Sequence, residues 1–206
     1  MTPRAVVFDI GNVLIEWNPE RFYDRTIGVA RRKALFAEVD LEGMNRQLDL
    51  GAPFRETVEA LARQHPEWSA EIMAWHDHWL DMASPEIPDS VRLLQGLRAN
   101  AVRTVALTNF GTETFGIAER AYPFLRAFDL RVVSGHLALM KPDPQIYQHV
   151  ENATGLSGAD LFFTDDRPEN VEAAAARGWQ VHLFDGPQGL ARRLRDLGLP
   201  VDEEAA

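Results

Sequence analysis

The sequence predicts an α/β protein in which an open parallel sheet of five core strands carries an inserted helical region. Three observations lead to this fold class. Five short apolar runs are continuous rather than alternating, as is typical of strands that helices cover on both faces. Helical stretches separate the last four runs, so right-handed crossovers would join parallel strands. The first two runs lie far apart in the chain, although a crossover needs only about a dozen residues.

Each predicted element follows from its own pattern. The strands are predicted over residues 5–8, 104–107, 130–133, 161–163 and 180–184. Helices are predicted over residues 144–153 and 169–177, and the second ends before Gly178, a residue type that commonly follows a helix C-terminus. Residues 89–100 carry apolar side chains at every third position from Val91, which predicts the helix that returns to the second strand.

The long interval between the first two strands predicts a second structural unit. Residues 16–88 contain helical segments broken at 51–53 and 65–66, and no strand candidate. We therefore expect a catalytic core made of residues 1–15 and 89–206, with residues 16–88 inserted as a helical cap. Ligands of open parallel sheets bind at the carboxyl ends of the strands, where such an insertion begins.

Composition narrows the function classes. The 206 residues are 46% hydrophobic and 25% charged, which excludes a disordered, collagen-like or coiled-coil chain. The formal charge of −10 argues against nucleic acid or an anionic membrane as partner, and the lack of cysteine excludes thiolate chemistry. Neither a signal-peptide pattern nor a long apolar stretch is present. We expect a soluble cytoplasmic protein, monomeric or homodimeric, with a small-molecule partner and a solvated tail at residues 202–206.

Polar residues follow four of the predicted strands, at the ends that meet at one edge of the sheet. They are Asp9, Thr108 with Asn109, Lys141, and Asp165 with Asp166, followed by Asn170. Four strand ends that converge on one crevice predict a functional site. Asn170 is open to two interpretations, since it either orients the acidic loop or caps the helix that follows.

The residue types in this set suggest one chemistry. A carboxylate such as Asp9 can act as a nucleophile. Asp165 and Asp166 beside it would repel it unless a cation lay between them, and Mg²⁺ is the hard ion that prefers such oxygen ligands. Lys141 could neutralise the nucleophile and a transferring phosphoryl group. Gly11 would permit close backbone approach after the strand.

Four ordered motifs carry a family resemblance that covers nearly the whole chain. They are Phe8-Asp9-Ile10-Gly11-Asn12-Val13, Leu107-Thr108-Asn109, Lys141-Pro142-Asp143-Pro144 and Phe163-Thr164-Asp165-Asp166. With these motifs the chain resembles the haloacid dehalogenase superfamily, most of whose members are phosphatases. The resemblance implies a Rossmann-like core with a small helical cap. The wording of the first and last motifs is similar to a branch that includes sugar-1-phosphate phosphatases.

The resemblance also implies a role for each motif residue. Asp9 would be the nucleophile that becomes aspartyl-phosphate. Asp9, the Gly11 carbonyl and Asp166 would bind Mg²⁺, and Asp165 would support the ion from outside its first ligand shell. Thr108, the N–H of Asn109 and Lys141 would hold the phosphoryl group. Trp17, in the predicted hinge to the cap, is a candidate for substrate contact. Together these roles describe a Mg²⁺-dependent hydrolase of a small phosphomonoester, with sugar phosphates among the candidates.

One position departs from the pattern. Most phosphatases of this superfamily carry a second Asp two residues after the nucleophile, where this chain has Gly11. That Asp protonates the leaving group, so three phosphatase-based alternatives follow: a substrate with a good leaving group, an acid supplied by the cap or Asp165, or a binding or regulatory member with weak catalysis. A 2-haloacid dehalogenase is a further alternative, with Arg21 or Arg25 as its cap arginine. The Asp165-Asp166 pair argues against that alternative.

Overall fold

The computed structural model describes residues 1–201, so the predicted tail at residues 202–206 lies outside the described part of the chain. Within it, five parallel strands form one sheet in the order β3-β2-β1-β4-β5. They are β1 (Ala5–Phe8), β2 (Arg103–Thr108), β3 (Leu130–Val133), β4 (Leu161–Asp165) and β5 (Gln180–Leu183). The predicted Rossmann-like sheet is confirmed, with strand ends that differ from the predicted ones by two residues at most.

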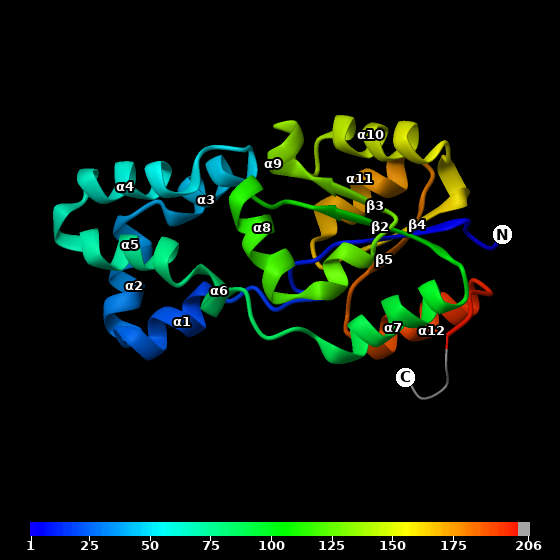
Figure 1. The fold of residues 1–206 in the computed structure, drawn as a ribbon, viewed down its shortest axis with the longest axis horizontal. Coiled ribbons are helices and arrows are strands. Elements are labelled where there is room, and N and C mark those ends of the chain that lie inside the picture. The colour runs from blue at the N-terminus through cyan, green and yellow to red at the C-terminus, as the bar shows by residue number, and fades with distance from the viewer. Residues whose placement is uncertain (202–206) are drawn as a thin grey trace.

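Helices cover both faces of this sheet (Figure 1). The helices of the core are α7 (Pro88–Ala99), α8 (Thr112–Ala121), α9 (Ser134–Leu137), α10 (Pro144–Thr154), α11 (Pro168–Ala176) and α12 (Pro187–Asp196). Alternate residues of β1 face opposite sides, as strand geometry requires. Val7 packs in the apolar cluster that contains Tyr147 of α10, whereas Val6 packs in the cluster that contains Leu94 of α7 and Leu194 of α12. The sheet is therefore buried on both sides.

The chain between β1 and α7 is helical, as the sequence predicts. It forms α1 (Pro19–Thr26), α2 (Val29–Glu38), α3 (Leu41–Asp49), α4 (Phe54–Gln64), α5 (Ser69–Asp77) and α6 (Trp79–Met82). Local sequence explains two of the helix starts. The side chain of Asn18 accepts a hydrogen bond from the Arg21 amide at the start of α1, and the side chain of Asp40 caps α3 in the same way through Gly43.

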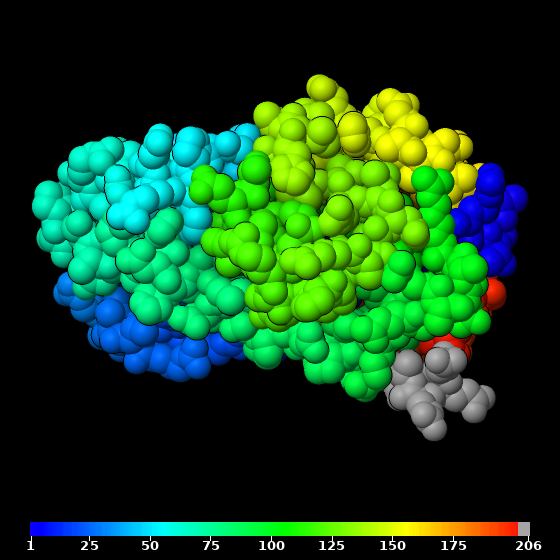
Figure 2. Space-filling model, viewed as in Figure 1, coloured from blue at the N-terminus to red at the C-terminus, as the bar shows by residue number. Residues whose placement is uncertain are grey.

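This helical insertion lies beyond one end of the sheet and makes a continuous surface with the core (Figures 1 and 2). One apolar cluster extends from Phe8 of β1 to Trp75 and Trp79 of the insertion. Two glycines mark close contact between the parts. A Cβ on Gly51 would lie 2.6 Å from the Gly135 carbonyl oxygen, and a Cβ on Gly111 would lie 3.1 Å from the Leu48 carbonyl oxygen. The end of α3 is therefore pressed against the loop that follows β2 and against α9, which follows β3.

Helix length bears on membrane association. In the part of the chain that the structure describes, no helix combines the length and the apolar character that crossing a bilayer requires.

Candidate active site

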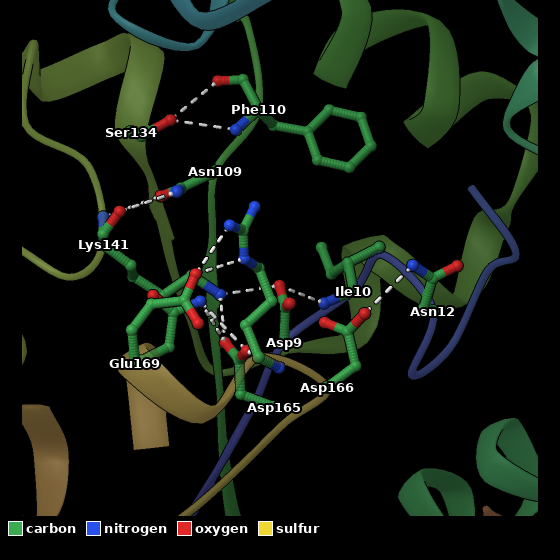
Figure 3. A network of polar contacts seen from close by, with 12 residues as sticks. Asp9, Ile10, Asn12, Asn109, Phe110, Ser134, Lys141, Asp165, Asp166 and Glu169 are labelled. Atoms are coloured by element: carbon green, nitrogen blue, oxygen red, sulfur yellow. Dashed lines mark hydrogen bonds and ion pairs between the residues drawn. The ribbon is translucent and has the colours of Figure 1, made fainter. Parts of the chain in front are cut away.

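The central strands bring three carboxylates together. Asp9 follows β1, and its amide donates a hydrogen bond to the Thr164 carbonyl of the adjacent strand β4 (3.0 Å). Oxygens of Asp9, Asp165 and Asp166 lie within 4.8 Å of one another, and no other group of three potential metal ligands occurs among residues 1–201. Asp9 and Asp165 are buried, and Asp166 is partly buried. Figure 3 shows the three side chains at the ends of their strands. The predicted cluster therefore forms, although its two motifs are separated by more than 150 residues of sequence.

Lys141 completes this cluster as a buried cation. Its side chain is 1% exposed, and its Nζ lies 2.8 Å from Asp9 Oδ1 and 2.6 Å from Asp165 Oδ2. Burial by itself lowers the pKa of Lys141, but the two carboxylates outweigh burial and raise the pKa above its usual range. Burial raises the pKa of Asp9 to about 7, assisted by Asp165 and Asp166 and opposed by Lys141. One lysine therefore does not fully compensate the negative charge of the three carboxylates.

Asp165 has its oxygens occupied by protein donors. Besides Lys141, it accepts hydrogen bonds from the Arg167 amide (2.9 Å) and from Asn170 Nδ2 (2.9 Å to Oδ1 and 3.1 Å to Oδ2). Asn170 is itself buried, and its carbonyl accepts from the Tyr147 hydroxyl (3.0 Å). Of the two interpretations of Asn170, the structure supports the one in which it orients the acidic loop.

The residues after β2 line the site and position Lys141. Thr108 is 1% exposed and lies at the end of the strand. The side chain of Asn109 makes two hydrogen bonds with the main chain of Lys141: its Nδ2 donates to the carbonyl (3.0 Å), and its Oδ1 accepts from the amide (2.8 Å). Asn109 thus has a structural function that the motif alone did not indicate.

Asn12 links the acidic cluster to the start of the insertion. Its Nδ2 donates to Asp166 Oδ2 (3.0 Å), and its Oδ1 accepts from the Trp17 amide (2.9 Å). The residue has a φ of 54°, a left-handed conformation that Asn tolerates better than most residues. Asn12 is part of the first motif but was assigned no role from the sequence. The positive φ that favours Asn at this position is known only from the backbone conformation, so the sequence alone could not indicate this role.

A cavity of about 1210 Å³ opens above this cluster. Nearly all the predicted site residues line it: Asp9, Gly11, Trp17, Thr108, Asn109, Lys141 and Asp166. Asp165 is fully buried below. The cavity has an aromatic wall made of Trp17, Trp75 and Trp79, with ring centroids 5.7 Å and 5.9 Å from that of Trp17. The wall lies on the side of the insertion, and the acidic cluster with Lys141 lies on the side of the sheet.

Two further expectations can be compared with the cavity. A Cβ on Gly11 would meet no atom within 4 Å, so neighbouring protein atoms do not require glycine there. Of the arginines that a dehalogenase would need, Arg21 is paired with Glu16 and the Ser84 carbonyl, and Arg25 is exposed. Neither belongs to the described residues that line the cavity. Neither Arg21 nor Arg25 is therefore placed to act as the cap arginine of a dehalogenase.

Asp49, at the end of α3, is a cavity residue that the sequence did not indicate. It is partly buried, and Asn45 Nδ2 donates to its Oδ2 (3.1 Å). Burial raises the pKa of Asp49 to about 7, while the charge of Lys141 acts to lower it. An acidic residue in a polar stretch of helix carries no pattern of its own, so only its position in the folded chain distinguishes it.

Known proteins resemble this chain in both sequence and fold. It is 33% identical over 109 residues to flavin mononucleotide hydrolase 1 of Arabidopsis thaliana, a match that covers 53% of this chain and 44% of the relative. It is 27% identical over 186 residues to the sesquiterpene phosphatase astK of Aspergillus oryzae, which covers 89% of this chain and 91% of the relative. The chain also matches the drimenol cyclase drtB of Aspergillus calidoustus, of which it spans 37%. It therefore spans less than half the length of this relative and of the flavin mononucleotide hydrolase.

Solved structures agree with the fold, and a family model identifies the family. The haloacid dehalogenase family enzyme bt-2542 of Bacteroides thetaiotaomicron, solved with magnesium and inorganic phosphate, superposes with a TM-score of 0.68 at 18% identity, covering 89% of this chain and 95% of the other. The model of the haloacid dehalogenase-like hydrolases matches residues 3–178. This protein therefore belongs to the haloacid dehalogenase-like hydrolase family.

Proposed function

We propose that this hydrolase is a Mg²⁺-dependent phosphatase of small phosphomonoesters that acts through an aspartyl-phosphate on Asp9. The observation that carries the proposal is the group of Asp9, Asp165 and Asp166 around buried Lys141 at the floor of a large cavity. Two relatives are named for hydrolysis of phosphorylated compounds, which agrees with this reaction class. We also propose that residues 16–88 act as the substrate-selecting cap of a core made of residues 1–15 and 89–206.

The donor set fits Mg²⁺. Three carboxylates within 4.8 Å of one another, with a single lysine between two of them, leave negative charge that a divalent cation would compensate. Asp9, Asp166 and the Gly11 carbonyl would hold the ion directly, since Asp9, Gly11 and Asp166 line the cavity. Asp165, whose oxygens accept from protein donors, would support it indirectly. When bound, the ion would neutralise phosphoryl oxygens.

The residues of the chain then have distinct tasks. A carboxylate oxygen of Asp9 attacks phosphorus, the bond to the leaving oxygen breaks, and an aspartyl-phosphate forms. Lys141 holds the attacking carboxylate in place and stabilises negative charge as it develops. The Thr108 hydroxyl and the main-chain N–H of Asn109 bind phosphoryl oxygens. Water then attacks the aspartyl-phosphate and releases inorganic phosphate, which restores Asp9.

The cavity constrains the substrate. The floor of the cavity is charged, whereas Trp17, which is partly exposed and packs on the buried Trp75 and Trp79, offers an apolar surface to the organic part of a substrate. Sugar phosphates are suitable first candidates, because sugars present apolar ring faces that stack on indoles.

The decisive experiment measures phosphate release from a panel of small phosphomonoesters, sugar 1-phosphates included, with Mg²⁺ and with EDTA. We expect Mg²⁺-dependent release, and we expect Asp9→Asn to lower kcat by at least about 10⁴-fold because the nucleophile is lost. Asp9→Asn with full activity would refute the assignment of Asp9. Metal-independent halide release from 2-haloacids would instead establish a dehalogenase, and phosphate binding without turnover would establish a binding protein.

A further inference from the structure

We propose that Asp49 of the insertion supplies the acid and base that Gly11 cannot supply. Asp49 protonates the leaving oxygen in the first step and accepts a proton from the attacking water in the second. This inference rests on the proposed phosphatase function and deepens it, because it assigns the group that permits hydrolysis of esters with poor leaving groups.

The need for another acid comes from the surroundings of Gly11. The position two residues after Asp9 has no side chain, and the space where a Cβ would lie is empty within 4 Å. Asp165 cannot replace the missing group, because Lys141 and Asn170 occupy both of its oxygens. A neutral acid must therefore come from another wall of the cavity.

Most of the carboxyl groups that line the cavity are already engaged. Cations pair with Glu16, Glu20 and Glu169. Each of these three carboxylates is committed to an ion pair with an arginine. Two more carboxylates accept hydrogen bonds from neutral donors. The Trp68 indole donates to Glu38, and the Gly43 amide donates to Asp40.

Two further cavity carboxyls, Asp166 and Glu42, are also unsuited to this role. Asp166 belongs to the acidic cluster and accepts from Asn12. Glu42 is exposed to solvent, whereas Asp49 is partly buried. Asp49 also lies outside the acidic cluster, which separates it from Asp166. Its side-chain hydrogen bond comes from the neutral amide of Asn45.

The position of Asp49 is defined by the contacts on either side of it. Leu48, the preceding residue, places its carbonyl against Gly111 of the loop after β2. Gly51, two residues later, lies against the Gly135 carbonyl and has a φ of 95°. Asp49 is therefore held where the end of α3 meets the loops of the core. The same β2 loop carries Thr108 and Asn109, the proposed phosphoryl-binding residues.

The protonation of Asp49 suits both steps. Its pKa of about 7 results from burial, opposed by the positive charge of Lys141 across the cavity. An acid–base group is most effective when its pKa lies near the working pH, because both forms are then available. The other charged groups of α3 that line the cavity are Glu42 and Arg46, both exposed to solvent.

The proposed reaction has two steps. Asp9 attacks phosphorus, the bond between phosphorus and the leaving oxygen breaks, and that oxygen takes the proton of Asp49 and leaves as an alcohol. Asp49, now ionised, removes a proton from water as the water oxygen bonds to phosphorus. The bond from phosphorus to Asp9 breaks, and the products are inorganic phosphate, free Asp9 and protonated Asp49.

The test compares two substrates whose leaving groups differ in their need for a proton. An alkyl phosphate must be protonated as it departs, whereas 2,4-dinitrophenyl phosphate releases a stable anion. We expect Asp49→Asn to lower kcat/KM for the alkyl phosphate by about 10²-fold or more. For the dinitrophenyl ester, we expect kcat/KM to change by less than about fivefold. Glu42→Gln removes a carboxyl from the same helix and the same cavity, and we expect it to leave both values within about twofold.

A rescue variant separates an acid role from a structural one. Gly11 has no positive φ and has free space around it, so Gly11→Asp can be accommodated there. In the Asp49→Asn background, we expect Gly11→Asp to raise kcat/KM for the alkyl phosphate by about tenfold or more. We expect it to change kcat/KM for the dinitrophenyl ester little. Equal loss on both substrates in Asp49→Asn, or no loss on either, would overturn the role of Asp49. A wild-type enzyme inactive on both esters would instead overturn the phosphatase proposal.

Discussion

The two sides of the cavity are built differently. On the side of the sheet, Lys141 is buried between Asp9 and Asp165, and Asp165 is further held by Asn170. On the side of the insertion, Asp49 has a hydrogen bond from Asn45, and the aromatic wall contributes mainly apolar surface. The first side is a charged network in which each group determines the position of the next. The second is a set of more independent groups, and its members can vary with less effect on the others.

The largest effect is expected at the centre of the charged network. Lys141→Met leaves Asp9 and Asp165 as unpaired buried charges, so we expect a loss of about 3 to 5 kcal/mol in the free energy of unfolding. The variant also removes a stabilising charge, and we expect kcat to fall by about 10³-fold. Denaturant unfolding and phosphate release measure the two effects. The matched control is Lys33→Met at an exposed lysine of α2, and similar behaviour of the two variants would contradict the network.

A second prediction concerns the pH dependence of stability at the cap. The pKa of Asp49 is raised by burial from 3.8 to about 7 in the folded protein, so the folded state binds its proton more tightly than the unfolded state does. Ionisation of Asp49 therefore costs stability as pH rises from about 4 to about 7, and the cost is complete above that range. We expect Asp49→Asn to be more stable than the wild type at pH 8 by about 3 kcal/mol, with little of this gain at pH 4.

The measurement is denaturant unfolding of metal-free protein at the two pH values. Glu42→Gln serves as the control, since an exposed carboxyl should give no such pH-dependent gain. A constant difference between Asp49→Asn and the wild type at both pH values would show that folding does not raise the pKa of Asp49.

A third prediction tests the metal-binding side of the network. We expect Asp166→Asn to raise the Mg²⁺ concentration for half-maximal activity by about 10- to 100-fold, because a ligand charge facing the cavity is removed. Folding should change little, since Asp166 accepts its side-chain hydrogen bond from Asn12 and an amide oxygen can accept it too. Isothermal titration with Mg²⁺ provides a readout independent of turnover. Unchanged Mg²⁺ affinity would exclude Asp166 as a ligand.

The smallest effect is expected at the aromatic wall. Trp17→Ala removes a partly exposed indole that contacts Trp75 and Trp79. We expect KM to rise about 3- to 10-fold for a substrate with a large organic group, with kcat within about twofold. A minimal substrate such as methyl phosphate, which does not reach the wall, should show no change in KM. A large loss of kcat on both substrates would place Trp17 in the catalytic network instead.

Prediction from sequence succeeded where one local pattern determined one local structure. Each strand is a continuous apolar run, and Asp9, Thr108, Asp165 and Asp166 lie at or directly after the end of such a run. Parallel pairing brings the ends of adjacent strands together, so Asp9 and Asp165 could be expected to meet before any coordinates existed. The dehalogenase alternative named Arg21 or Arg25 as its cap arginine, but neither lines the cavity, because Arg21 pairs with Glu16 and Arg25 is exposed. The packing of α1 decides which way these side chains point.

The sequence by itself therefore determined the sheet, the helical insertion and the acidic floor of the cavity, because their signals are short-range periodicity and strand-end chemistry. Only the tertiary structure decided the opposite wall. Asp49 lies 40 residues after Asp9 in a helix without a distinctive pattern. It acquires a raised pKa and a place in the cavity because α3 packs against the loop after β2 and against α9. Burial and proximity of this kind arise from contacts between distant segments, which no local pattern of residues records.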